Sequence, residues 1–172
     1  MSSYFRHPLV IPALLLAAAA IVMATVFYFQ FGMGLAPCHL CYIERIPYYG
    51  GIAGLVIVLG LHAPTGHATP YGRALLALVG LGFLIGAGIA AYHVGVEQKW
   101  WPGPDSCTGS VSGGSLDDAV DRLLAAPLVR CDEIVWSLFG ISMAGYNVLV
   151  SLGLGGCALA AARAMGDTGR QQ

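Results

Sequence analysis

Charged side chains are scarce in this sequence of 172 residues, of which 10% are charged and 57% are hydrophobic. An ordinary soluble domain carries about 25% charged residues, so this composition excludes the soluble globular class and predicts a protein of the lipid bilayer. The net charge is only -1, and the sequence lacks the basic stripe that would attract nucleic acid. Nucleic-acid partners are therefore not expected.

Long polar segments are also rare. A helix that spans a membrane needs about 20 mostly apolar residues. Four stretches qualify, at about 9–31, 47–61, 74–94 and 136–162. They predict an all-α membrane protein, with residues 1–172 forming one integral membrane domain. We expect a bundle of four transmembrane helices, with outer loops at about 32–46 and 95–135.

The first stretch has an alternative interpretation as a cleavable signal peptide. Arg6 precedes it, and the alanines at 17–20 resemble the small residues of a cleavage site. Apolar residues continue to Phe31, however, which is long enough to span a membrane. We therefore expect an uncleaved helix.

Basic residues do not decide the orientation, because the positive-inside rule counts lysine and arginine, and four fall on each side. The cysteines at 38, 41, 107 and 131 all lie on the side of the long loop. Paired thiols accumulate in oxidising compartments. We therefore expect the long loop outside the cytoplasm and both termini inside it.

The long loop contains one helical pattern. Ser115 resembles an N-cap, and apolar residues between 116 and 124 share one helical face. This pattern predicts a short interfacial helix on the membrane surface. A small helix that packs on the protein itself is the alternative.

Only one close cysteine pair is present, Cys38-x-x-Cys41, where the first outer loop meets the second helix. Such a pair can close a disulfide across one turn, and a helix N-terminus favours the reactive thiolate. There are two alternatives. One is a zinc site that the pair forms together with Cys107 and Cys131, and the other is a set of purely structural disulfides. Because Cys107 and Cys131 are 24 residues apart and zinc sites usually repeat the close spacing, no metal is expected.

Arg45 strengthens the redox interpretation. On a helix, Cys38, Cys41 and Arg45 stand at i, i+3 and i+7 and share one stripe. A cation there can stabilise a thiolate or a reduced quinone oxygen, although an arginine that extends to lipid headgroups is the plainer interpretation. Pro47 lacks the N–H that would bond to Ile43, so we expect the regular helix to begin close to the proline.

Three motifs together resemble the DsbB family of bacterial inner membranes, and the resemblance covers almost the whole chain. They are residues 38–45 (CHLCYIER), residues 102–107 (PGPDSC) and residues 131–133 (CDE), the last followed by Trp136. The resemblance implies an enzyme, a protein-disulfide:quinone oxidoreductase that reoxidises a periplasmic DsbA-type thiol oxidase. It also implies a multi-pass inner-membrane protein whose active cysteines face the periplasm.

The resemblance further implies roles for the four outer cysteines. Cys107 and Cys131 would form the loop disulfide that reduced DsbA attacks, with Cys107 taking the mixed disulfide. Cys131 would then attack Cys38, and Cys41, beside Arg45, would donate electrons to the quinone. The implied cofactor is ubiquinone or menaquinone from the membrane pool.

His93 stands four residues before Glu97 near the end of the third helix, within possible reach of a quinone. We predict that it contributes to quinone binding and proton delivery, with an ordinary interfacial histidine as the alternative.

Two other functions compete with this assignment. The first is a quinone reductase that resembles the vitamin K epoxide reductases, although their Cys-x-x-Cys usually lies late in the chain. The second is a non-catalytic protein with four spans, in which the cysteines form structural disulfides.

Overall fold

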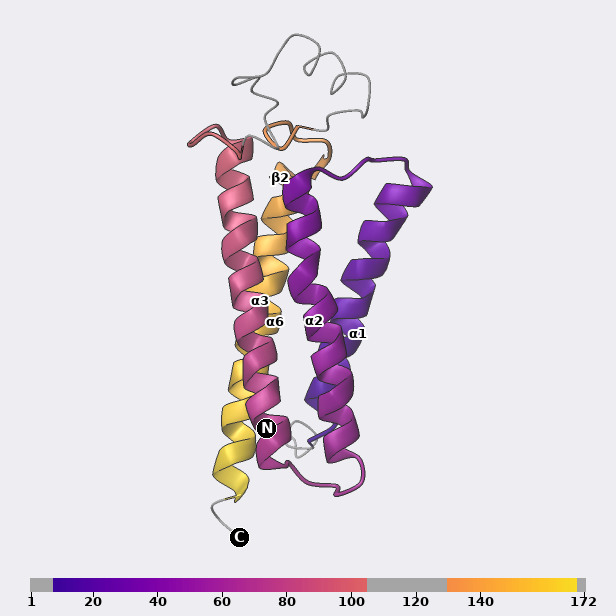
Figure 1. Ribbon diagram of the computed structural model, residues 1–172, viewed down its shortest axis with the longest axis vertical. Helices are drawn as coiled ribbons and strands as arrows, with labels where there is room; N and C mark the ends of the chain where they lie inside the picture. Colours follow the sequence, from indigo (N-terminus) through magenta and orange to yellow (C-terminus); the bar gives the residue numbers. More distant parts are fainter. Residues whose placement is uncertain (1–7, 105–129, 170–172) are drawn as a thin grey trace, which may run out of the picture.

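The protein is a bundle of four long helices, seen in a computed structural model that describes residues 8–104 and 130–169 (Figure 1). The helices are α1 (Val10–Phe27), α2 (His39–His62), α3 (Pro70–Glu97) and α6 (Met143–Gly169). Within the described residues, four helical segments are long and apolar enough to cross a membrane. The predicted fold class, an all-α membrane protein with four spans, is confirmed. The predicted interfacial helix and Cys107 lie outside the described residues.

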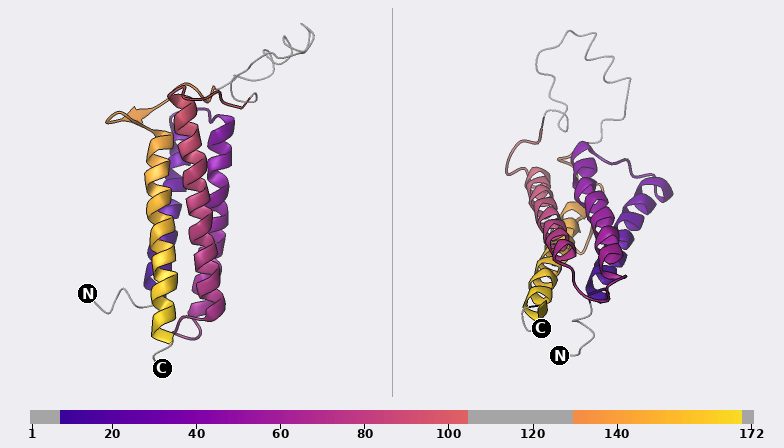
Figure 2. Two further views of the ribbon diagram at one scale, coloured as in Figure 1. Left: turned by 90° about the vertical axis from the view of Figure 1, so that its left-hand side faces the viewer. Right: turned by 60° about the horizontal axis from the view of Figure 1, so that its bottom comes forward.

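The helices alternate in direction along the bundle. The start of α1 and the end of α6 lie at one end, together with the connection between α2 and α3 (Figures 1 and 2). The opposite end carries the start of α2, the end of α3 and a β-hairpin. Among the described residues, the segments that carry Cys38, Cys41 and Cys131 therefore meet at this second end, which we call the active end.

The start of α2 differs from the prediction. The helix begins at His39, and Pro47 lies inside it. Because a proline cannot donate to the carbonyl four residues earlier, a start near the proline was expected. The neighbouring helix leaves room for the ring: a Cβ on Gly86 of α3 would lie 3.1 Å from Cβ and Cγ of Pro47. Packing between membrane helices allows such an interior proline.

The fourth helix also begins later than predicted. Residues from 136 were assigned to it, but strands β1 (Ser137–Leu138) and β2 (Ile141–Ser142) precede it as an antiparallel hairpin. Phe139 and Gly140 form the turn with φ of 51° and 79°, values that do not occur in a right-handed helix. Ser142 then caps α6, because its Oγ accepts a hydrogen bond from the N–H of Gly145 at 3.1 Å.

The first and third helices lie close to the predicted stretches. α1 continues into a single π-helical turn, η2 (Tyr28–Gly32), and contributes Leu15 and Met23 to the core. α3 is longer than the predicted 74–94 because Thr69 caps it, accepting from the N–H of Gly72 at 3.1 Å. The main core lies between all four helices.

Two glycines bring α3 and α6 into backbone contact. A Cβ on Gly155 would lie 2.9 Å from the carbonyl oxygen of Gly80, and a Cβ on Gly80 would lie 3.1 Å from that of Gly155. Small residues at such crossings let membrane helices approach closely, so that dispersion contacts stabilise the bundle. Of these two positions, Gly155 has less room for a side chain, because the backbone oxygen of Gly80 opposes it at 2.9 Å.

We predict that Gly155→Ala lowers the free energy of unfolding by about 1–3 kcal/mol, the usual range for an overpacked core. The matched control is Gly156→Ala, because no atom lies within 4 Å of a Cβ there. Thermal unfolding in detergent, followed by circular dichroism, measures both variants. Equal stability of the two would show that α3 and α6 do not pack through Gly155.

Candidate active site

Cys38 and Cys41 lie at the start of α2, and both are free thiols. Cys38 is the N-cap residue, and its sulfur accepts a hydrogen bond from the backbone N–H of Cys41 at 3.3 Å. The two sulfur atoms are 2.8 Å apart. The thiol of Cys41 and, to a smaller extent, the ring of His93 lower the pKa of Cys38 below that of an ordinary thiol, although burial opposes them. Cys38 is therefore the thiolate that this arrangement favours.

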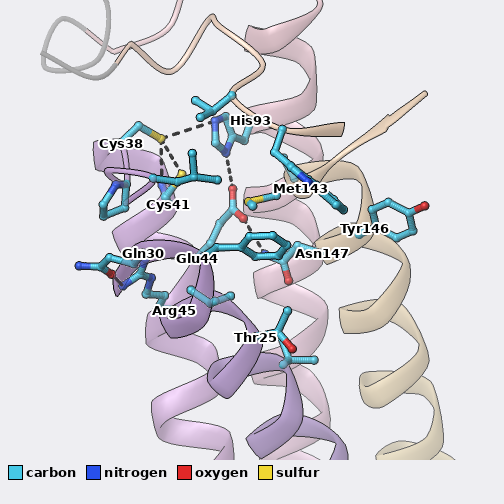
Figure 3. A pocket seen from close by; sticks show the side chains of 18 of the residues that line it. Thr25, Gln30, Cys38, Cys41, Glu44, Arg45, His93, Met143, Tyr146 and Asn147 are labelled. Carbon is cyan, nitrogen blue, oxygen red and sulfur yellow. Dashed lines mark hydrogen bonds and ion pairs between the residues drawn. The ribbon is translucent and has the colours of Figure 1, made fainter. Parts of the chain in front are cut away.

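His93 on α3 connects Cys38 to a buried carboxylate on α2. Its Nε2 lies 3.7 Å from the sulfur of Cys38, and its Nδ1 lies 2.5 Å from Oε1 of Glu44. Figure 3 shows the imidazole between the thiol and the carboxylate. A carboxylate at Nδ1 makes that nitrogen a donor, so Nε2 is the atom that exchanges a proton with the sulfur: it accepts from the Cys38 thiol and, once protonated, donates to the thiolate. Thiol, imidazole and carboxylate thus form the chain of groups that activates a nucleophilic cysteine.

Glu44 also contacts a third helix. Nδ2 of Asn147 on α6 donates to Oε2 of Glu44 at 2.6 Å. Oδ1 of Asn147 accepts from the hydroxyl of Tyr48 at 2.8 Å and from that of Ser151 at 3.0 Å. Each of these polar groups is satisfied inside a bundle that faces lipid, as buried groups must be. The network fixes the positions of α2, α3 and α6 around the carboxylate.

Cys131 approaches the same thiol from the segment before the hairpin. It is disulfide-bonded, 1% exposed, and packed in a small cluster with Cys38, Leu40 and Val96. The sulfur atoms of Cys38 and Cys131 and a ring nitrogen of His93 all lie within 4.8 Å of one another. The structure therefore brings together three of the residues predicted from the sequence, with Cys41 directly beside them.

Arg45 lies on the same face as Cys41 but does not contact it through a hydrogen bond among the described residues. Its Nη1 donates to Oε1 of Gln30 at 2.6 Å, and its guanidinium lies over the rings of Tyr42 and Phe27. The side chain is 6% exposed, and its Nε has no hydrogen-bond partner in the described part of the chain. A buried donor of this kind needs an acceptor.

A cavity of about 430 Å³ opens beside these residues, between α1 and α6. Cys41, Glu44 and Arg45 reach it from α2, and His93 reaches it from α3 (Figure 3). Most of the remaining lining comes from α1, η2, residues 35–38, residues 130–138 and α6, and the greater part of it is apolar. Charged side chains also line the cavity at 97, 130 and 133. A largely apolar cavity with a few convergent polar groups is typical of a small-molecule site.

Comparison with known proteins identifies the family. The family model described as "Disulfide bond formation protein DsbB" matches residues 8–161. The chain belongs to the DsbB family. The disulfide bond formation protein B 2 of Pseudomonas syringae pv. syringae is 34% identical over 139 residues, 80% of this chain and 78% of that protein.

Two further relatives are named disulfide bond formation protein B. The Xanthomonas campestris pv. campestris protein is 32% identical over 140 residues, 80% of each chain. The Marinobacter nauticus protein is 29% identical over 148 residues, 77% of this chain and 82% of that protein. No solved structure gives a significant match.

Membership of the DsbB family makes the chain a multi-pass inner-membrane oxidoreductase of disulfide bond formation. This result favours the predicted enzyme over the two alternatives, a vitamin K epoxide reductase type and a non-catalytic protein with structural disulfides. The individual roles of the four cysteines, Arg45 and His93 stay predictions.

Three polar residues of the site were not singled out from the sequence: Glu44, Tyr48 and Asn147. Glu44 does carry a signal, because an acidic side chain inside a membrane span marks a functional site by default. Asn147 and Tyr48 carry none, because their role depends on which helices pack together.

We predict that His93→Phe raises the pKa of Cys38, since the hydrogen bond from the ring helps to stabilise the thiolate. The shift should be about one unit or more. The rate of Cys38 alkylation by iodoacetamide, measured against pH and mapped by mass spectrometry, reports it. His67→Phe, which alters an exposed histidine in the loop between α2 and α3, is the control. Identical pH profiles for wild type and His93→Phe would contradict the contact.

Proposed function

We propose that this protein is a thiol:quinone oxidoreductase that reoxidises a periplasmic DsbA-type dithiol oxidase. Electrons pass from the partner to the Cys107/Cys131 pair, then to the Cys38/Cys41 pair, and finally to ubiquinone or menaquinone. The observation that carries the proposal is the approach of Cys131 to Cys38 beside the cavity. The active end then faces the periplasm, and both termini lie in the cytoplasm.

Thiol exchange moves the electrons inward. A thiolate of the reduced partner attacks Cys107, the Cys107–Cys131 bond breaks, and Cys131 leaves as a thiolate. Cys131 then attacks Cys38, the Cys38–Cys41 bond breaks, and Cys41 leaves as a thiolate. The second partner thiol attacks the partner sulfur bonded to Cys107, which closes the partner disulfide and releases Cys107 as a thiolate. Cys107 then attacks Cys131, the Cys131–Cys38 bond breaks, Cys38 leaves as a thiolate, and the outer disulfide is restored. The partner has lost two electrons, and Cys38 and Cys41 have gained them.

The geometry supports the inner exchange step. Direct attack requires the two sulfur atoms to approach without a large movement of the backbone, and those of Cys38 and Cys131 already lie within 4.8 Å. Both are buried, so water does not compete for the reacting thiolate.

The cavity fits a quinone headgroup. Its volume of about 430 Å³ lies within the usual range for small-molecule sites, and Cys41 lines it. The unpartnered Nε of Arg45 supplies a buried donor for a quinone oxygen. When bound there, the quinone supplies an acceptor for two electrons and two protons.

His93 and Glu44 manage the protons. When Cys38 and Cys41 close their disulfide, two electrons and two protons leave the thiols. Nε2 of His93 lies against the Cys38 sulfur and accepts a proton there, while Glu44 stabilises the resulting imidazolium through Nδ1. Both residues line the cavity, so the proton is held beside the acceptor.

The first test mixes purified, quinone-loaded protein with a reduced DsbA-type partner without oxygen. We predict that the absorbance of oxidised quinone falls with the wild type and not with Cys41→Ser. The control is Cys157→Ser, which removes an exposed thiol on α6 and should behave as the wild type. Unchanged quinone in the intact wild type would refute the relay.

A second variant tests the proton path. Glu44→Gln removes the anionic partner of His93 and should slow quinone reduction by about 10²-fold at neutral pH. Raising the pH should restore part of the rate, because the thiol then loses its proton to hydroxide and no longer needs the weakened base His93, whereas a purely structural defect would not respond. His67→Gln is the control, since it removes an exposed titratable side chain in the loop between α2 and α3, away from the cavity. A wild-type rate for Glu44→Gln would exclude the proton path.

A further inference from the structure

We propose that the fully reduced chain binds a thiophilic divalent cation of the zinc type through Cys38, Cys131 and His93. Sequence spacing argued against a metal, because it considered four cysteines alone. The fold adds a histidine from α3, so the site does not require a second close cysteine pair. The site shares Cys38 and His93 with the lining of the quinone cavity and adds Cys131, which does not line it.

The positions of the three ligand atoms suit a tetrahedral cation. Zinc bonds of about 2.3 Å to sulfur and 2.0–2.1 Å to nitrogen separate adjacent ligand atoms by about 3.6–3.8 Å. The sulfur of Cys38 lies 3.7 Å from Nε2 of His93. All three ligand atoms lie within 4.8 Å of one another, so small side-chain rotations complete the site. Cys41, with its sulfur 2.8 Å from that of Cys38, can supply the fourth ligand once a side-chain rotation widens this separation to the tetrahedral value.

The surroundings of His93 match those of a metal ligand. Glu44 binds Nδ1 at 2.5 Å, and Asn147 holds the carboxylate from its other oxygen at 2.6 Å. A carboxylate behind a histidine fixes the tautomer, orients the ring and makes the free nitrogen a better ligand. Cys38, His93 and Cys131 are 4%, 4% and 1% exposed, so a bound cation would exchange slowly with water.

Binding depends on the redox state. Cys131 is disulfide-bonded in the structure, whereas Cys38 and Cys41 are thiols. Two electrons and two protons from a dithiol, such as the proposed partner, or from a phosphine reductant convert the disulfide into two thiols. Cation binding then displaces the thiol protons. Only the reduced chain offers both sulfur atoms.

A bound cation would stop the relay, because Cys131 could no longer attack Cys38. This consequence rests on the proposed function, whereas binding itself does not. A cation of this kind would hold the enzyme in its reduced, inactive form when oxidised quinone is scarce.

The experiment uses Co²⁺ as a spectroscopic probe of the full-length protein in detergent. The protein is reduced with a phosphine, separated from it without oxygen, and titrated with Co²⁺. We expect the visible absorption of tetrahedral cobalt and a near-ultraviolet thiolate charge-transfer band, both lost when Zn²⁺ is added. Protein with Cys131 in its disulfide should give neither band.

Variants assign the ligands. Cys131→Ser should abolish the charge-transfer band or weaken cobalt binding at least about 100-fold, and Glu44→Gln should weaken it about 10–100-fold. Cys157→Ser should bind as the wild type does. Circular dichroism checks that each variant is folded. Cys131→Ser is the more secure variant, because it leaves His93 and the Glu44 network unchanged.

Three outcomes would overturn the site: no cobalt spectrum in the reduced wild type, an unchanged spectrum in Cys131→Ser, or loss of the spectrum in Cys157→Ser. The titration needs neither partner nor quinone. Cobalt binding without quinone reduction would therefore refute the relay and support the metal site. Quinone reduction without cobalt binding would support the relay and refute the metal site.

Discussion

The buried carboxylate of Glu44 is the constraint on which the rest of the bundle depends. A lone carboxylate inside a membrane protein is costly, so each oxygen needs a donor. His93 and Asn147 supply these donors at 2.5 and 2.6 Å, and they belong to α3 and α6. Removing one partner of such a group typically costs about 3–5 kcal/mol. A single side chain on α2 thus sets the rotation of two other helices and, through Nε2 of His93, aims a base at Cys38.

The first helix stands outside this network and has a different role. The first span is strongly apolar, and it is the least buried of the four. Of its most apolar 18-residue stretch, 22% is buried in the bundle, against 39% for each of the other spans. The continuation of α1, η2, contacts α2 through the hydrogen bond between Gln30 and Arg45 near the active end. α1 therefore forms a wall of the cavity without fixing the thiols.

Much of this arrangement follows from periodicity, and the remainder does not. The four spans follow from the length of the apolar stretches, and the common face of Cys41 and Arg45 follows from helical spacing. The role of Pro47 does not, because Gly86 on another helix makes room for its ring. The role of Asn147 could not be predicted either, since one amide in an apolar stretch acquires a function only when helix packing places it beside Glu44. Sequence patterns define each helix, whereas contacts between helices depend on their relative rotation.

The ends of the helices explain why the chemistry is located where it is. A thiol that exchanges with a loop cysteine must be reachable from outside the membrane, yet one that reduces a lipid-soluble acceptor must border the bilayer. The N-cap of α2 satisfies both demands, because Cys38 meets Cys131 there and Cys41, one turn further on, lines the cavity. The backbone N–H groups at this terminus also favour a thiolate. Moving the pair deeper into α2 would keep contact with the acceptor, but it would lose the loop cysteine and the helix N-terminus together.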